Sequence, residues 1–506
     1  MKDLQTGIQL EAMISERGFL EKGNFILGRN LMHMYAKCGS LEKAHIVFDR
    51  LCVRDVITWT VLVNSYIEYG YGAQALSFVQ EMRYEGVSPD DITFVCGLKA
   101  CGSVRDVRKG MQIHYEIVNR GLLEENSDVV LGNALIDMYA KCGELCDAEI
   151  VLQDIPIRNA VSWSALIAGY AQKGKCDVAL NCYAKMKGEG ILPDSIAFIC
   201  ILKACGNTRA LDKGKQIHDE IVHRDLLDKD IMLGTTLVDM YAKCGVLTKA
   251  YEVLKGLPIR NVVSWNALIT GYAQQGQCSE ALHCFTLMQN EGIYPDAVTF
   301  INILKACASI GAIDEGKQIH EEIVGRGLLD KNNILLGNAL VDMYVKCGML
   351  VKARQVLEEL LVRDVISWNT LIAGYVQQGQ GHDVLDCFQS MKSEGFAPDV
   401  ATYSCVLKAC GNLQDIERGK EIHDEIVSKG LLEKEIVIGN ALVDMYVKFG
   451  HLAKAQKVLK ELPYRDTVSW STLIAGYAQH ERSYEALNCF EVMKRDGISP
   501  NSITFI

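Results

Sequence analysis

A twelve-residue motif recurs five times along the chain at a nearly constant interval. Its copies read GRNLMHMYAKCG from Gly28, GNALIDMYAKCG from Gly132, GTTLVDMYAKCG from Gly234, GNALVDMYVKCG from Gly337 and GNALVDMYVKFG from Gly439. Their tyrosines lie 104, 102, 103 and 102 residues apart, at Tyr35, Tyr139, Tyr241, Tyr344 and Tyr446. A fixed period sustained over a whole chain indicates a repeat array, in which each unit packs against its neighbours.

Each period divides into three related helical hairpins. In the fourth period they have 31, 35 and about 36 residues, and they span residues 334–364, 365–399 and 400–435. Apolar residues such as Leu336, Leu340 and Met343 are three or four positions apart, which is the spacing of one helix face. Gly348 and Pro398 interrupt the helical pattern, and the alternation typical of strands is absent. We therefore predict an all-α fold, an α-solenoid superhelix of stacked helix-turn-helix hairpins.

The repeats divide the chain into three segments: a partial repeat over residues 1–24, a solenoid of about fourteen repeats over residues 25–501, and the start of a further truncated repeat over residues 502–506. Because residues 7–9 align with the middle of a repeat, we expect the chain to be part of a longer protein. Its N-terminus has neither the apolar core of a signal peptide nor the arginine-rich composition of a transit peptide. No apolar run reaches the ~18 residues of a membrane span, so we predict no membrane contact.

The 19 cysteines fit apolar packing better than metal binding. Two sets of four occupy fixed repeat positions: Cys38, Cys142, Cys244 and Cys347, and Cys101, Cys205, Cys307 and Cys410. Phe449 replaces the first set in the fifth copy, as expected of a packing residue, and no CxxC pair occurs. We predict no metal and no cofactor. The formal net charge of −11 excludes a surface that is basic throughout, but it is compatible with a basic stripe along one face.

Lines such as VSWNALITGYAQQGQCSEALHCFTLMQNEGIYPD, residues 263–296, closely resemble the pentatricopeptide repeat family, and the resemblance covers essentially the whole chain. The alternation of hairpin lengths is similar to the S, P and L motif triplets (PLS type) of the family's plant members, with residues 1–24 as a partial L-type repeat. The tetratricopeptide pattern, W-x2-L-G-x2-Y followed by A-x3-F and P, is not met.

The resemblance implies a sequence-specific single-stranded RNA-binding protein of mitochondria or chloroplasts. Many triplet-type members specify cytidine-to-uridine RNA editing sites, and they usually carry additional C-terminal domains. The zinc deaminase signature of some members is absent from this sequence, so we predict no enzymatic activity and no small-molecule substrate. Editing or processing factors are the expected protein partners. The alternatives are passive stabilisation of an RNA and a tetratricopeptide-like protein-binding scaffold.

In helical-repeat RNA-binding proteins each repeat reads one base through two or three side chains. In this family they are the fifth and the last residue of a motif. The P-type pairs are Thr60 with Asp90, Ser164 with Asp194, Asn266 with Asp296, Asn369 with Asp399, and Ser471 with Asn501. The S-type pairs are Arg29 with Asp55, Asn133 with Asn159, Thr235 with Asn261, Asn338 with Asp364, and Asn440 with Asp466. Apart from Arg29, all are compact hydrogen-bonding residues.

Helix capping is the alternative explanation for the last position, because Asp and Asn favour helix N-termini and turns. It does not explain the variation among Asn, Ser and Thr at the fifth position. The family's pairing rules predict the RNA 5′-?GxCGxAUxUUxUA-3′, whose first base is left open by Arg29. The x bases face L-type motifs, where the fifth residue cannot hydrogen-bond to a base in three cases and is serine in one: Val95, Ile199, Ile301 and Ser404.

The family also holds each base between the apolar second residues of successive motifs. In the P-type and S-type motifs these are Ile57, Val130, Val161, Met232, Val263, Leu335, Ile366, Val437 and Val468. Taken singly, such a residue is more often part of the core than a contact. Lysines recur at one S-type position and at one L-type position, and two such rows would form a basic stripe for phosphates: Lys37, Lys141, Lys243, Lys346 and Lys448, and Lys99, Lys203, Lys305 and Lys408.

Two further sets recur once per triplet. The tryptophans precede the fifth residue of each P-type motif, and we expect them to pack between helices rather than stack on bases: Trp59, Trp163, Trp265, Trp368 and Trp470. The histidines are separated by three hairpins, or tens of ångströms, so they cannot share a metal and are expected to be near-neutral packing or surface residues: His114, His218, His320 and His423.

Overall fold

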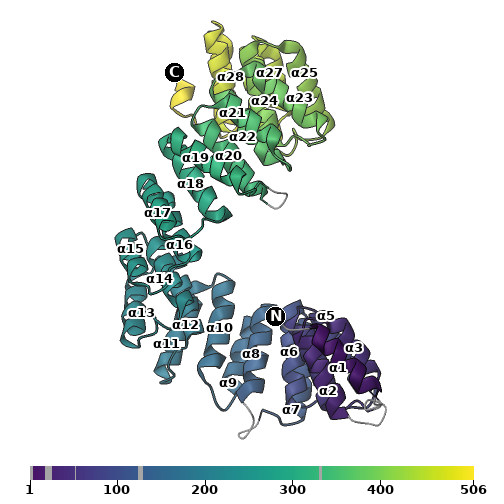
Figure 1. Cartoon of the computed structure of the whole chain (residues 1–506). Helices are drawn as coiled ribbons and strands as arrows, with labels where there is room; N and C mark the ends of the chain where they lie inside the picture. The colour runs from purple at the N-terminus through teal and green to yellow at the C-terminus, as the bar shows by residue number, and fades with distance from the viewer. Residues whose placement is uncertain (1–3, 17–24, 52, 124–128, 330–332, 506) are drawn as a thin grey trace. The chain divides into compact units, whose positions relative to one another are not determined.

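The computed structural model describes residues 4–16, 25–51, 53–123, 129–329 and 333–505. Within these ranges the chain forms 29 α-helices and one short 3-10 helix, and no strand occurs (Figure 1). The predicted all-α fold is therefore confirmed. None of these helices combines the length and the apolar character that crossing a lipid bilayer requires.

The chain divides into two compact units, residues Met1–Arg260 and Asn261–Ile506. The helices of the first unit are α1 Leu4–Glu16, α2 Phe25–Lys37, α3 Leu41–Asp49, α4 Val56–Glu68, α5 Gly72–Tyr84, α6 Asp91–Val104, α7 Val107–Asn119, α8 Val129–Cys142, α9 Leu145–Asp154, α10 Ala160–Gln172, α11 Cys176–Gly188, α12 Ser195–Thr208, α13 Leu211–His223, α14 Ile231–Lys243 and α15 Leu247–Gly256.

The helices of the second unit are α16 Val262–Gln274, α17 Cys278–Asn290, α18 Ala297–Ile310, α19 Ile313–Gly325, α20 Ile334–Lys346, α21 Leu350–Glu359, α22 Val365–Gln377, α23 Gly381–Ser393, α24 Val400–Leu413, α25 Ile416–Ser428, α26 Ile436–Lys448, α27 Leu452–Glu461, α28 Thr467–Gln479 and α29 Ser483–Arg495, followed by the 3-10 helix η1 Ser502–Phe505.

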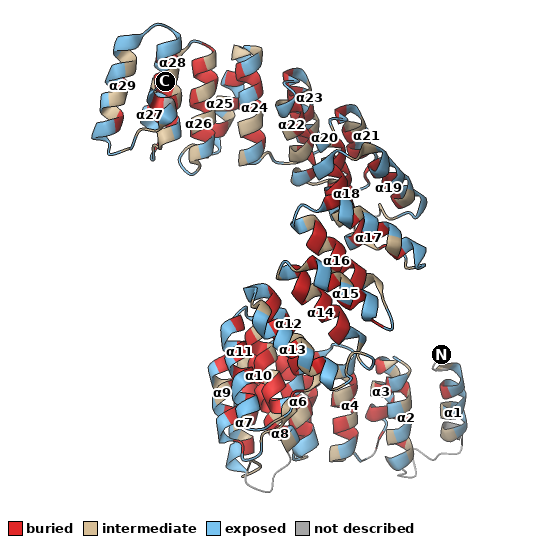
Figure 2. Cartoon of the chain, turned by 90° about the vertical axis from the view of Figure 1, so that its left-hand side faces the viewer, coloured by how far each residue is buried: buried red, intermediate tan, exposed pale blue. Residues whose placement is uncertain are grey.

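From α2 onward each even-numbered helix is the first helix of a hairpin and the following odd-numbered helix is the second. Within each unit the first helices of successive hairpins contact one another, so they form one continuous layer. The second helices form the other layer. Buried residues fill much of the first helices, whereas the second helices alternate buried and exposed faces (Figure 2). This is the nearest-neighbour stacking of a solenoid.

Close packing of the first helices depends on small residues at the contact. A Cβ atom at Gly374 of α22 would lie 2.5 Å from Cγ1 of Val345 on α20, closer than real side chains approach. The turns inside the hairpins also use glycine: Gly276, between α16 and α17, has a φ angle of +74°, a conformation that other residues adopt at a cost.

The recurring tyrosines and histidines join adjacent hairpins. Nδ1 of His320 on α19 lies 3.0 Å from the hydroxyl of Tyr344 on α20, and the same pairing recurs at 2.8–2.9 Å in three other triplets: His114 with Tyr139, His218 with Tyr241, and His423 with Tyr446. Burial lowers the pKa of each of these histidines. The histidines are thus near-neutral interhelical contacts, as expected from the sequence.

The tryptophans and one of the two cysteine sets are buried as predicted, whereas the other set, Cys38, Cys142, Cys244 and Cys347, is only partly buried. The five tryptophan side chains are only 1–5% exposed, which removes them from any surface that could stack on a base. Cys101, Cys205, Cys307 and Cys410 are fully buried, and burial raises the pKa of their thiols to about 11 or 12. No cluster of three or more potential metal ligands occurs among the described residues.

Candidate nucleic-acid interface

The last residue of a motif caps the first helix of the next motif. The carboxylate of Asp194, for example, accepts a hydrogen bond from the backbone N–H of Ala197 at 2.8 Å. The same capping bond is made by Asp55, Asp90, Asn159, Asn261, Asp296, Asp364, Asp399, Asp466 and Asn501. The capping explanation is therefore correct for this position. It does not exclude a second role, because a carboxylate has further acceptor sites.

The fifth residue of the same motif turns toward that cap. The hydroxyl of Ser164 donates to Asp194 at 2.7 Å, and Nδ2 of Asn369 donates to both carboxylate oxygens of Asp399 at 3.0 Å. Direct contacts of 2.9–3.4 Å also join Asn133 with Asn159, Asn266 with Asp296, Asn338 with Asp364, Asn440 with Asp466, and Ser471 with Asn501. The structure thus brings seven of the ten predicted pairs into direct contact.

Three predicted pairs differ. Thr60 reaches Asp90 through Thr93, whose hydroxyl lies 2.8 Å from that of Thr60 and 2.6 Å from the carboxylate. Arg29 is half-buried on α2, while its predicted partner Asp55 caps α4. Thr235 belongs to the first unit and Asn261 to the second.

The apolar second residues are exposed. Ile366 is 62% exposed and Leu335 is 71% exposed, and the exposed fractions of the nine predicted residues run from 50% to 71%. The expectation that each residue alone belongs to the core is wrong, because the second position lies on the side of the first helix that faces away from the neighbouring hairpins. A row of apolar side chains that are at least half exposed leaves apolar surface available to a ligand.

Two groups of residues at this surface were missed by the sequence analysis. The second residues of three L-type motifs are as exposed as the others, at 64%, 58% and 52%: Ile92, Ile196 and Val298. The third residue of most motifs is a buried serine or threonine that contacts the pair of the preceding motif, as Thr93 does. Both groups recur at fixed repeat positions, which is the signal that could have identified them.

One cavity of about 380 Å³ in the first unit gathers the predicted residue types. Two exposed second residues, one pair and both kinds of lysine line it: Ile57, Ile92, Thr60, Asp90, Lys37 and Lys99. A pocket that combines apolar side chains, hydrogen-bonding groups and cations has the chemistry needed to hold a nucleobase with its phosphate.

The lysines of the S-type row are paired with carboxylates. Nζ of Lys346 lies 2.8 Å from Asp342, one turn earlier on α20. Equivalent ion pairs of 2.7–2.8 Å hold Lys141, Lys243 and Lys448, and Lys37 lies 3.3 Å from Glu68. The L-type lysines Lys99, Lys203, Lys305 and Lys408 are exposed and make no ion pair with any described residue. The two predicted lysine rows therefore contain both neutralised and free cations.

The L-type fifth residues contribute little hydrogen-bonding capacity. Val95, Ile199 and Ile301 are aliphatic, and the hydroxyl of Ser404 donates to the carbonyl of Val400 in its own helix at 2.8 Å.

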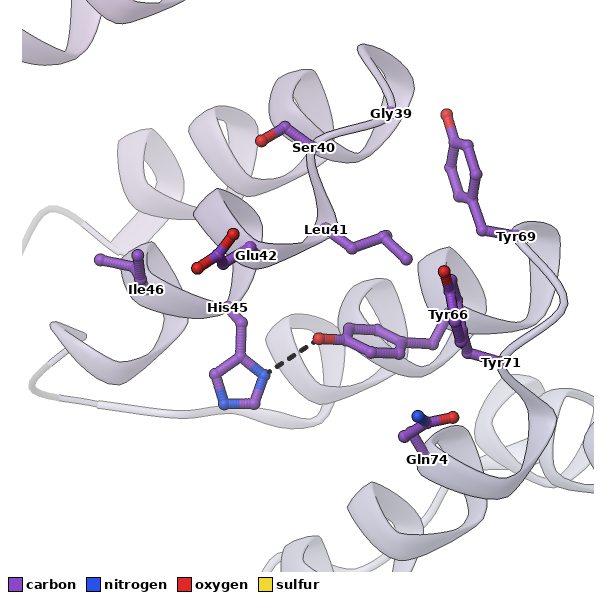
Figure 3. Close-up of a pocket in the computed structure, with 10 residues that line it drawn as sticks. All are labelled: Gly39, Ser40, Leu41, Glu42, His45, Ile46, Tyr66, Tyr69, Tyr71 and Gln74. Carbon is purple, nitrogen blue, oxygen red and sulfur yellow. Dashed lines mark hydrogen bonds between the residues drawn. The ribbon is translucent and has the colours of Figure 1, made fainter.

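A separate cavity of about 570 Å³ lies between α3, α4 and the start of α5 (Figure 3). Tyr66, Tyr69 and Tyr71 line it together with His45, whose Nδ1 lies 3.4 Å from the hydroxyl of Tyr66. None of the predicted site residues lines this cavity, so it is distinct from the candidate interface.

Comparison with known families agrees with the repeat pattern. A family model described as the PPR repeat family matches residues 54–103, 158–207, 260–309, 363–412 and 465–506, and a model described as the PPR repeat matches residues 29–56, 338–365, 401–431 and 440–466. The chain belongs to the pentatricopeptide repeat family.

Curated relatives cover nearly all of the chain. It is 32% identical to the chloroplastic pentatricopeptide repeat-containing protein At4g18520 of Arabidopsis thaliana over 479 residues, and this alignment covers 94% of this chain and 76% of the relative. It is 35% identical over 487 residues to the mitochondrial protein At3g53360 of the same plant, covering 96% and 62%. With At4g39530 of A. thaliana the identity is 34% over 501 residues, covering 98% of this chain and 59% of that relative.

Solved structures share the fold. The crystal structure of the pentatricopeptide repeat protein PPR10 from maize has a TM-score of 0.52 at 21% identity, over 94% of this chain and 80% of that one. The structure of PPR10 in complex with an 18-nt psaJ RNA element has a TM-score of 0.50 at 20% identity, with the same coverage.

Proposed function

We propose that this chain is a non-catalytic, sequence-specific single-stranded RNA-binding protein that contacts one base per repeat. The observation that carries the proposal is the combination of an exposed apolar row with hydrogen-bonded polar pairs beside it, repeated along each unit. The fold it shares with PPR10, which was solved in complex with RNA, supports the same partner. A protein-binding scaffold gives no reason to restrict the pairs to Asn, Ser, Thr and Asp.

In this proposal each base lies between the second residues of two successive motifs, such as Ile57 and Ile92. Its edge then meets the fifth and last residues at the base of the slot. The caps fix the last residues in place, so the hydrogen-bonding groups are oriented before RNA arrives, which lowers the entropic cost of binding. The free L-type lysines, of which Lys99 lines the cavity of the first unit, would neutralise phosphates.

The hairpin lengths and the pairs support a division of residues 25–501 into S, P and L motifs, with partial repeats before and after. The pairs then predict the RNA 5′-?GxCGxAUxUUxUA-3′. The L-type motifs retain the apolar wedges but lack base-reading side chains, so they would hold a base without selecting it.

We further propose that the chain acts on organellar RNA and specifies a site of editing or other processing, with the chemistry supplied by other domains or partners. The names of the relatives place one in the chloroplast and one in the mitochondrion. Since this chain spans about 59% of one relative and 62% of another, the activity of the whole protein includes whatever the remaining length provides. Passive protection of the bound RNA is the second candidate.

The test is binding of the chain to a 14-nucleotide RNA carrying the predicted bases, compared with an RNA in which G and A are exchanged. Dissociation constants are measured over a salt series. Tighter binding of the predicted RNA by at least about tenfold, or roughly 1.4 kcal/mol, is expected. Equal and steeply salt-dependent binding of both RNAs would show an electrostatic groove without base reading, and absence of binding would favour the protein scaffold.

A further inference from the structure

Four proposed base-reading sites of the second unit, called slots here, each consist of the fifth and the last residue of one motif. They carry the same Asn–Asp pair but differ in the residue that supports it. All four are predicted to read uracil, and they are Asn266 with Asp296, Asn338 with Asp364, Asn369 with Asp399, and Asn440 with Asp466. The supporting residue is the third residue of the following motif. It is threonine in two slots and serine in the other two, and all four side chains are fully buried: Thr299, Thr402, Ser367 and Ser469.

In the threonine slots both ends of the asparagine amide are held. The hydroxyl of Thr402 lies 2.6 Å from Oδ1 of Asn369 and 2.9 Å from a carboxylate oxygen of Asp399, and the nearer oxygen, that of Asn369, receives its one proton. Nδ2 of Asn369 donates to Asp399 at 3.0 Å. Burial opposes ionisation of Asp399, but hydrogen bonds from the backbone N–H of Thr402 and from Asn369 help to outweigh it and hold the pKa of this carboxyl below its usual value.

The other threonine slot has the same geometry. The hydroxyl of Thr299 donates to Oδ1 of Asn266 at 2.6 Å, and Nδ2 of Asn266 donates to Asp296 at 2.9 Å.

In the serine slots only one end of the amide is held. The hydroxyl of Ser367 donates to the backbone carbonyl of Asp364 at 2.7 Å, so it does not reach Asn338. Oδ1 of Asn338 is buried and has no hydrogen-bond partner among the described residues, and its Nδ2 contacts Asp364 at 3.2 and 3.4 Å.

The last slot repeats this arrangement. Ser469 donates to the carbonyl of Asp466 at 2.9 Å, and Oδ1 of Asn440 has no partner among the described residues. The serine slots therefore hold their asparagines by longer contacts, and at one end only.

The difference bears on base discrimination. A pyrimidine is identified by whether its edge presents an acceptor, as O4 of uracil does, or a donor, as the amino group of cytosine does. An amide bonded at both ends presents its one remaining N–H in a fixed direction, which suits an acceptor. An amide with a free oxygen can rotate to offer oxygen or nitrogen, at the loss of one weak hydrogen bond.

We propose that the third residue of the following motif is a positioning residue for base reading: a hydroxyl bonded to Oδ1 of the reading asparagine makes that slot prefer uracil over cytosine more strongly than a slot with a free Oδ1. The inference rests on the proposed RNA-binding function. It adds a third side chain, from the neighbouring motif, to those two-residue reading units whose asparagine accepts that hydroxyl.

The experiment measures the ratio of affinities for U and C at single nucleotides of the predicted RNA. Thr402→Val removes the hydroxyl and keeps the branched shape, and it is expected to lower the U/C ratio at nucleotide 11 by about three- to tenfold, the contribution of one hydrogen bond. The ratio at nucleotide 8, read by Asn266, remains unchanged.

Ser367→Ala is the matched control. It also removes a buried capping hydroxyl, but that hydroxyl does not contact Asn338, so the U/C ratio at nucleotide 10 is expected to stay the same. Ala197 occupies the equivalent position after Asp194, so the fold accommodates alanine there. Thermal unfolding of each variant reports any general loss of structure, which would change the affinity ratios at all nucleotides together.

An unchanged ratio at nucleotide 11 in Thr402→Val, with wild-type preference for U intact, overturns this inference alone. An equal drop at nucleotide 10 in Ser367→Ala also overturns it, because loss of the cap would then be sufficient. Absence of any base preference in the wild-type chain overturns the proposed base reading as well.

Discussion

Neutralising Asp342 is expected to strengthen RNA binding. Asp342 lies 2.8 Å from Lys346, a lysine of the predicted phosphate row, and the two side chains are 29% and 55% exposed. An exposed ion pair of this kind contributes about 0.2–1 kcal/mol, which an incoming phosphate must replace. Removing the carboxylate by Asp342→Asn frees the lysine, so affinity for the 14-nucleotide RNA should rise by about 1.4- to 5-fold at low salt.

The assay is fluorescence anisotropy of labelled RNA between about 50 and 200 mM salt, where phosphate contacts change affinity most visibly. The gain should shrink as salt rises, because screening weakens the charges. Asp314→Asn is the control: Asp314 lies 3.3 Å from Lys317 on the second helix α19, so it makes the same charge change away from the interface. If Asp342→Asn leaves affinity unchanged, or if Asp314→Asn raises it equally, Lys346 does not contact phosphate.

Two other predictions concern the exposed apolar second residues, which are proposed to hold the bases, and the buried contacts. Ile366→Ala should weaken RNA binding with little change in stability, because Ile366 is 62% exposed. Trp368→Ala should instead destabilise the fold by about 3–5 kcal/mol, because Trp368 is 3% exposed. Urea unfolding and RNA titration of both variants separate the two effects, and RNA binding that is weakened in Trp368→Ala but not in Ile366→Ala would refute a contact between Ile366 and a base. Burial lowers the pKa of His320 in the folded state, so the unfolded chain binds its proton more readily. The stability that neutral His320 contributes is fully present above its unfolded pKa of about 6.5, and it is lost as the pH falls through the lower folded pKa. Unfolding curves at several pH values should therefore show that the free energy of unfolding falls less on acidification in His320→Gln than in the wild type. An equal fall in both proteins would contradict the role of His320 as a buried neutral contact.

The sequence predicted the helical hairpins and most of the polar pairs. Helical spacing and turn residues recur in every period, so the signal for the fold is repeated many times. The pair Asn369 and Asp399 was assigned through the family resemblance, and the structure places the two side chains in contact. Their contact with a base remains a proposal.

Exposure was harder to predict than helicity. Ile366 and Trp368 are both apolar and two residues apart on α22, yet one is exposed and the other is buried. Hydrophobicity alone does not distinguish them, because the side of the helix that meets the neighbouring hairpins is fixed only by packing. The pairing of Lys346 with Asp342 could have been predicted, since residues four apart on a helix are neighbours.

The direction of the hydroxyl of Thr402 could not have been predicted. Serine and threonine hydroxyls rotate to suit local partners, and Thr402 and Ser367 choose different ones in similar surroundings.

The most direct test of the account is a change of base preference by one substitution. Asn369→Thr converts an Asn–Asp pair into a Thr–Asp pair, which the pairing rules assign to guanine. Affinities of wild type and variant are measured for four RNAs that differ only at nucleotide 11. The account predicts that the preferred base changes from U to G at that nucleotide and at no other. An unchanged preference for U, or a uniform loss of affinity for all four RNAs, would contradict base reading by this pair.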